Sequence, residues 1–146
     1  MFPSLHRRGP TKQEIRTLVE KVATLPPVEL PVKHHFSMGT YVREIHMPAG
    51  SVVVGKEHKT RHTNIVVSGK CTVWTAQGRM ELVGPCTFES MAGVQKVLHM
   101  HTDVVWMTVH PTDETDLDRL EGMFIQSEQQ IPLFPALDNL LLGDTV

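Results

Sequence analysis

The sequence contains no run of about eighteen or more apolar residues, the length that a helix needs to cross a lipid bilayer. We therefore expect no membrane partner. The formal net charge is only −2, so the chain also lacks the basic excess that is typical of proteins that bind nucleic acid. Its first ten residues include no apolar segment of the kind that directs secretion, and we expect the protein to be cytoplasmic.

Cysteine is scarce, with only Cys71 and Cys86 in the chain. They fall on different predicted strands, and free thiols are the rule inside cells, so a disulfide between them is the alternative. Catalytic motifs are also missing: there is no Gly-x-Ser-x-Gly, no phosphate-binding glycine loop and no Cys-x-x-Cys. Glu44 and Glu81 have no evident acid–base partner in the sequence. We therefore predict no catalytic residue.

Two short helices are predicted, one near each end of the chain. Residues 11–14, Thr-Lys-Gln-Glu, have the pattern of a capping box and should begin a helix over residues 12–23 that Pro26-Pro27 ends. Thr115 is the predicted N-cap of the second helix. The apolar residues at helical spacing are Ile15, Leu18, Val19 and Val22 in the first helix and Leu117, Leu120 and Phe124 in the second.

Between these helices the sequence changes to short β-branched runs separated by turn residues. The runs predict eight strands, at residues 41–47, 51–54, 64–67, 70–75, 80–83, 86–90, 96–101 and 104–110. Eight short strands at regular spacing indicate a sandwich or barrel of the jelly-roll type. We expect an N-terminal arm with a helix (residues 1–32), one barrel domain (33–111), and a C-terminal helix and tail (112–146). His34-His35 falls in the predicted linker before the barrel strands.

Two segments of the predicted barrel have the glycine punctuation of a known pair of motifs. The first, from Gly50 to Gly69, reads GSVVVGKEHKTRHTNIVVSG, and the second begins at Met91-Ala92-Gly93. Together they resemble the two motifs of the cupin superfamily. This resemblance implies a mainly β protein, a cupin-type double-stranded β-helix (jelly roll), with short N-terminal and C-terminal helices and an extended apolar C-terminal tail.

The resemblance also places particular residues at the positions where many cupins hold a metal ion. Lys56, His58 and His62 stand at the ligand positions of the first motif, where the family pattern has two histidines and a glutamate. Lys96 stands where the second motif has its histidine. Only two of these four positions therefore carry an imidazole.

Longer phrases of the chain narrow the resemblance. The runs GTYVREIHMPAG, VGKEHKTRHTNIV, MAGVQKV and VVWMTVHPTDETDLDRLE are similar to small single-domain cupin proteins encoded in tailed-bacteriophage genomes. What this implies is a fold and a lineage, because cupins host many unrelated functions. It also suggests a location in the cytoplasm of the host cell or in the virion.

Two kinds of ligand fit the motif positions. His58 and His62 would bind a divalent transition metal if a third donor came from His99, His101 or Tyr41, and we name His101 as the metal ligand to test. His110 on the last strand is another donor in range. Lys56 and Lys96 oppose a cation and favour a small anion, such as a carboxylate or phosphate, with Tyr41 as a further ligand-binding residue.

The C-terminal segment 131–142 is too apolar for a solvated tail, and its prolines interrupt any long regular element at its start. We expect it to pack either on its own barrel or on a neighbour, as in a homo-oligomer or against other virion or protein subunits. The leading interpretation is a non-enzymatic cupin-fold binding or structural module, a phage virion or phage-encoded accessory protein that assembles through its termini. The alternative is a small metal-dependent cupin enzyme or sensor that acts on a small polar molecule.

Overall fold

The structure is a computed structural model that describes residues 4–5, 11, 13–14, 16–17, 20, 30–54, 59–75, 78–94, 96–124 and 129–131. Lys56, His58 and most of the apolar segment 131–142 lie outside the described residues. In the described part of the chain no helix is both long and apolar enough to cross a bilayer.

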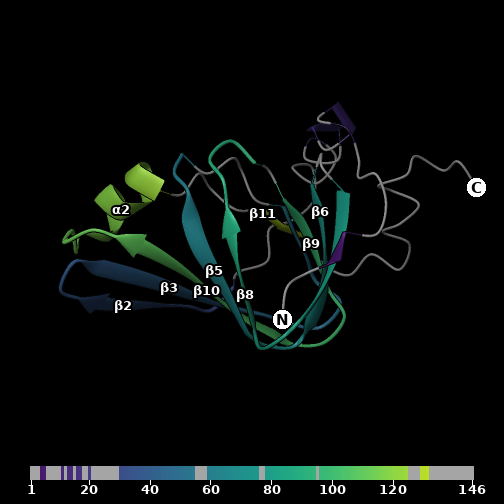
Figure 1. The fold of residues 1–146 in the computed structure, drawn as a ribbon, viewed down its shortest axis with the longest axis horizontal. Helices are drawn as coiled ribbons and strands as arrows, with labels where there is room; N and C mark the ends of the chain where they lie inside the picture. Colours follow the sequence, from purple (N-terminus) through teal and green to yellow (C-terminus); the bar gives the residue numbers. More distant parts are fainter. Residues whose placement is uncertain are drawn as a thin grey trace, which may run out of the picture.

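Within the described residues, eleven strands form two antiparallel sheets (Figure 1). The six-stranded sheet has the order β1 (Ser4–Leu5), β7 (Gly78–Val83), β6 (Lys70–Thr75), β9 (Val97–Met100), β4 (Val52–Val54) and β11 (Gln129–Ile131). The five-stranded sheet has the order β2 (Val32–Ser37), β3 (Thr40–Met47), β10 (Val104–Pro111), β5 (His62–Ser68) and β8 (Cys86–Ser90). The mainly β architecture and the jelly-roll class predicted from the sequence are confirmed.

The core lies between the two sheets. Side chains of one face of each sheet form a single cluster, because residues directly opposite one another in an antiparallel pair point to the same side. Cys71 and Cys86 belong to this core as free, buried thiols, as predicted, and burial raises the pKa of Cys71 to about 12. The best-buried members of the cluster, each no more than 1 % exposed, are Val66, Cys71, Val73, Leu82, Met100 and Val104.

The eight predicted strands are all present. The predictions at 70–75 and 86–90 match the ends of β6 and β8, and the others differ by one or a few residues. The described residues of the segment 12–23 are helical, and the Thr11 hydroxyl accepts a hydrogen bond from the amide of Glu14 at 3.1 Å. The capping residue predicted there is therefore confirmed.

Two local predictions were wrong. His34 and His35 do not lie in a linker: they belong to β2, an edge strand that pairs with β3 along its full length. The N-cap of α2 (Leu117–Phe124) is Asp116 and not Thr115, because a side-chain oxygen of Asp116 accepts from the amide of Arg119 at 3.1 Å. Aspartate at this position is as good a cap as threonine and is better placed against the positive end of the helix.

Gly69 closes the turn between β5 and β6 and is packed against the turn before β10. Its φ of +98° lies in the left-handed region, and a Cβ atom added to it would come 2.2 Å from the carbonyl oxygen of Asp103. Only glycine fits such a position. This is the second glycine of the first cupin-like motif, so the motif's punctuation has a steric reason in this structure.

Candidate ligand-binding site

The inner face of the five-stranded sheet is divided into a polar end and an apolar end. Trp106 pairs with Ile45 on one side and with Val66 on the other, which makes a wholly apolar row across three strands. Four residues further along β10, His110 lies opposite Tyr41 on β3. At the start of β5, His62 lies opposite Ser90 on β8. The polar end of the barrel is thus set by strand register, because a shift of one residue would turn all these side chains outward.

Three rings form the centre of the polar end. Tyr41 and His110 have ring centroids 6.0 Å apart, and His110 and His62 have centroids 5.3 Å apart. All three residues are buried, with exposed fractions of 1 %, 0 % and 4 % for Tyr41, His110 and His62. At the outer edge, the hydroxyl of Tyr41 is hydrogen-bonded to Nδ1 of His34 at 2.7 Å. The row therefore runs from a surface histidine to a buried one.

Helix α2 covers this end of the barrel. Figure 1 shows the helix beside the end of β10, from which the chain runs directly into it. Among the side chains of α2 that the structure describes, Leu120 packs against Tyr41 and is 1 % exposed. The single apolar residue at the centre of α2 thus closes the polar end.

Lys96 contributes a positive charge to the same end. It precedes β9, is only 8 % exposed, and holds its ammonium 5.9 Å from the centroid of the Phe88 ring on β8. The pKa of His62 is lowered, first by burial and further by the charge of Lys96, although hydrogen bonds with Thr60 and Asn64 act in the opposite direction. Lys96 therefore acts electrostatically on His62.

His110 is held in its neutral form. Burial is the main cause, and the charges of His62 and Arg43 add to it, so that the pKa of His110 falls to about 4. At neutral pH the polar end therefore contains two neutral imidazoles near one lysine ammonium.

A hydrogen-bonded group joins the polar end to the apolar core. The amide of Asn64 donates to the hydroxyl of Ser90 at 2.7 Å and accepts at its oxygen from the indole nitrogen of Trp106 at 3.1 Å. We did not predict Asn64 or Ser90 from the sequence. The signal that was available is strand alternation, because Asn64 is two residues from His62 and so faces the same side.

A pocket of about 330 Å³ opens beside His62. Arg61 and Glu89 line it and form an ion pair with each other, and Thr63 and Pro111 complete much of its wall. Apart from His62, the strand residues that line the pocket alternate with the inward-facing ones, so the pocket lies on the outer face of the five-stranded sheet.

The structure brings together three of the predicted site residues, Tyr41, His62 and Lys96, at the polar end. It does not bring His101 to them: His101 follows β9 and contacts Thr72 on the outer face of the six-stranded sheet. Lys56 and His58 lie outside the described residues. The structure thus separates the two described residues of the predicted metal set, His62 and His101.

The described residues at the polar end do not fit a cupin-type metal ion. Within the part of the chain that the structure describes, no three or more His, Cys, Asp or Glu residues are grouped to hold one. His62 and His110 supply two imidazoles, but the ammonium of Lys96 acts on His62 where a cation would bind. We therefore derive no chemistry through a metal at this site.

Comparison with solved structures identifies the fold. No protein-family model and no curated protein matches the sequence. The chain is similar to ectoine synthase from P. lautus, with a TM-score of 0.54 and 10 % identity over 79 % of this chain and 86 % of that one. It is also similar to a cupin superfamily protein from Desulfitobacterium hafniense DCB-2, with a TM-score of 0.51 and 11 % identity over 75 % and 99 % of the two chains. The chain therefore has the cupin fold that its two motifs predict.

Proposed function

We propose that this protein is a non-enzymatic cupin-fold module that binds a small anion, a carboxylate or a phosphate, at the polar end of its barrel. The observation that carries this proposal is the buried residue Lys96, whose positive charge acts on His62. In a low-dielectric interior, a charge attracts an opposite charge far more strongly than it does in water. Tyr41 and the neutral imidazoles add groups that can hydrogen-bond to an anion's oxygens.

Lys56, the second lysine at a motif position, would add to the charge, and its contribution can be tested in the same way as that of Lys96. Among the described residues, few side chains could act as a catalytic acid or base near the polar end. The carboxylate of Glu44, for example, is hydrogen-bonded to His35 and His46 on the outer face of β3, away from the polar end. A binding role therefore accounts for more of the described residues than an enzymatic one does.

Replacing Lys96 with Met should weaken anion binding at least tenfold, because Met keeps most of the side-chain volume and removes the charge. A tenfold loss corresponds to about 1.4 kcal/mol. Inorganic phosphate and succinate are suitable probes, first by thermal shift and then by titration calorimetry. The matched control is Lys70→Met, since Lys70 is an exposed lysine on β6.

Two results would overturn the anion proposal. One is equal affinity in wild type, Lys96→Met and Lys56→Met. The other is near-stoichiometric iron, manganese, nickel or zinc in the purified protein whose removal abolishes a measurable reaction, which would favour the alternative of a metal-dependent cupin enzyme or sensor with His58 and His62 as ligands.

We further propose that the protein is a phage-encoded accessory or virion protein that assembles with copies of itself, in the host cytoplasm or in the virion. The resemblance of several phrases to small phage cupin proteins supports the lineage, and the apolar segment 131–142 supports assembly. Burying one Leu or Phe side chain is worth roughly 1.5–3 kcal/mol, so six of them would offset the ordering of the segment. These six are Leu133, Phe134, Leu137, Leu140, Leu141 and Leu142.

Ending the chain after Ile131 should shift the protein toward monomer in light scattering and leave its β-sheet circular dichroism nearly unchanged. This truncation keeps β11, which pairs with β4. Ending the chain after Leu142 is the control, since it removes only the residues beyond the apolar segment. A truncated protein that keeps its full assembly state would contradict the proposal, and one that unfolds would place the segment in the core of its own domain.

A further inference from the structure

The edge strand β2 is exposed along almost its whole length. Five of its six residues are exposed, and Figure 1 shows it as the outermost strand of the five-stranded sheet. It pairs with β3 without a bulge, and among the strands that the structure describes none pairs with its other side. Proteins usually keep such an edge short, bulged or covered, because its backbone can pair with another strand. β2 shows none of these three protections.

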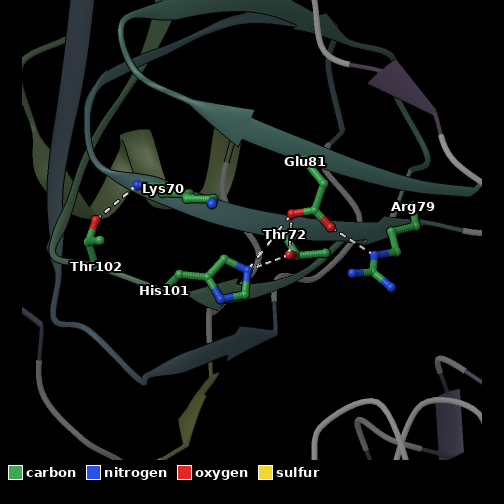
Figure 2. Close-up of polar contacts among 6 residues, drawn as sticks. All are labelled: Lys70, Thr72, Arg79, Glu81, His101 and Thr102. Atoms are coloured by element: carbon green, nitrogen blue, oxygen red, sulfur yellow. Dashed lines mark hydrogen bonds and ion pairs between the residues drawn. The ribbon is translucent and has the colours of Figure 1, made fainter.

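The other sheet edges in the described part of the chain are short or partly buried. The six-stranded sheet ends in β1 and β11, which are only two and three residues long. On the five-stranded sheet, β8 has both of its end residues buried. Polar groups on the outer face of the six-stranded sheet are already bonded to one another, as Thr72 is to Glu81 and His101 (Figure 2). β2 is therefore the longest exposed edge that the structure describes.

The hydrogen bonds between β2 and β3 show which backbone groups face the open edge. The carbonyl of Pro31 accepts from the amide of His46 at 3.0 Å. Hydrogen-bonded pairs alternate with non-hydrogen-bonded pairs along an antiparallel ladder, so residues 33, 35 and 37 bond to β3. The amides and carbonyls of residues 32, 34 and 36 therefore point away from β3. These are the groups with which a further strand would pair.

The side chains at this edge are apolar at both ends of the strand. Val32, His34 and Phe36 share the inner face, because Phe36 lies opposite Tyr41 and side chains alternate. Phe36 is 44 % exposed, although its ring stacks on that of Tyr41 at 5.3 Å. Val32 lies at the other end of the strand and packs partly against the core. The edge thus carries one apolar residue two positions away on each side of His34.

This pattern is complementary to itself. If two β2 strands pair antiparallel about a twofold axis at His34, Val32 of each copy lies opposite Phe36 of the other, and β-branched–aromatic pairs of this kind stabilise a sheet. Two β2 strands must turn their outward backbone groups toward each other, which also allows an axis at Lys33 or at His35. An axis at Lys33 would place two ammonium groups opposite each other. An axis at His35 would leave Val32 beyond the end of the second strand.

The polar face of the paired strands would be balanced in charge. With the axis at His34, Lys33 lies opposite His35 of the second copy. Both side chains are exposed, and both contact the carboxylate of Glu44 in their own chain, at 3.9 Å and 3.0 Å. Hydrogen bonds with His46 and His35 lower the pKa of Glu44, so this carboxylate stays charged. Each Lys33–His35 pair therefore has a carboxylate beside it.

We propose that β2 is a dimerisation edge, at which a second copy of this chain pairs its own β2 antiparallel about a twofold axis at His34. The two five-stranded sheets then form one continuous sheet. A twofold contact uses the same edge of both copies, so it closes and does not lead to open-ended growth. The contact requires neither the charge of Lys96 nor the segment 131–142, and it is independent of the function proposed above.

Cross-linking of the full chain at His34→Cys tests the contact and its register together. At the axis the two Cα atoms would be about 5.5 Å apart, a distance that a disulfide spans. Oxidation should therefore convert most of this variant to a covalent dimer on a non-reducing gel. Met38→Cys is the control, because residue 38 is 98 % exposed but lies beyond the strand, and it should cross-link at least tenfold more slowly. The buried native thiols Cys71 and Cys86 give the background rate in the wild type.

Sedimentation of the full chain measures the affinity. Phe36→Lys should weaken the dimer at least tenfold, because it replaces an apolar contact with a charge of the kind that protects edge strands. Met38→Lys is the control and should change the affinity less than twofold. Circular dichroism of each variant separates loss of the contact from loss of the fold.

A wild-type chain that sediments as a monomer at submillimolar concentration would overturn the proposal. So would cross-linking of His34→Cys that is no faster than that of Met38→Cys, or a dimer that Phe36→Lys does not weaken. The His34→Cys cross-link should also form in the chain that ends after Ile131, which separates this contact from the assembly proposed for the segment 131–142.

Discussion

Lowering the pH from 7.5 to 5.0 should cost the folded protein about 2 kcal/mol through His110 alone. The pKa of His110 is about 4, against 6.5 for an ordinary histidine, because the ring is buried. Between these values the unfolded chain binds a proton that the folded chain does not, so stability falls as pH falls. The lowered pKa of His62 acts in the same direction. Urea unfolding at several pH values measures the effect.

His110→Phe should remove most of this pH dependence, because the new ring keeps the contacts with Tyr41 and His62 and cannot be protonated. Glu44 and Glu81 do not interfere above pH 5, since their pKa values are lowered from 4.5. His35→Gln serves as the control, because His35 is an exposed histidine on β2. If the His110→Phe protein loses as much stability between pH 7.5 and 5.0 as the wild type, His110 is not the buried neutral group described above.

Trp106→Ala should destabilise the protein by about 3–5 kcal/mol, the usual cost of emptying a large buried site. Trp106 is 4 % exposed, packs edge-on against Phe88 at 5.5 Å and donates to Asn64. Trp106→Phe fills most of the space but leaves the oxygen of Asn64 without its donor. It should therefore still cost about 1–3 kcal/mol beyond the packing loss. Guanidinium unfolding followed by circular dichroism gives both values.

Trp74 provides the matched comparison for the hydrogen-bond part of this cost. It is 2 % exposed, and among the described residues its indole nitrogen has no hydrogen-bond partner. Trp74→Phe should consequently be the milder of the two Trp→Phe changes by about 1 kcal/mol. Equal costs at the two positions would mean that the bond between Trp106 and Asn64 adds nothing to stability.

The strands that could be predicted are those with buried β-branched and apolar side chains between turn residues. Residues 70–75 and 86–90 have β-branched and apolar side chains between clear turns, so both ends were predicted. β2 was missed because five of its six residues are exposed and its histidines and lysine show no apolar alternation. Its strand conformation comes from pairing with β3, which is a tertiary interaction that the local sequence does not reveal.

The motif positions predicted that Lys96 and His62, which are distant in sequence, belong to one site. The structure describes these two residues at the polar end, and the other two motif positions, Lys56 and His58, lie outside the described residues. The contact between Asn64 and Ser90 depends on the register of β5 with β8, which local periodicity cannot fix. His101 was paired with His62 from donor type alone, although the position of His101 on the outer face follows from the alternation that also places Lys96 inside.

The close packing around Gly69 limits how this sequence can change over evolutionary time. Any other residue at position 69 would bring a Cβ atom into the Asp103 carbonyl and also within 2.9 Å of the Val104 backbone. A substitution there would therefore require the turn at Gly69 and the turn before β10 to shift together. Gly39 and Gly93 also have positive φ, but nothing lies within 4 Å of their Cβ positions, and Asn or Asp can adopt that conformation at a small cost. A lineage of this protein can therefore drift at Gly39 and Gly93 by single substitutions, whereas position 69 has no one-step route away from glycine.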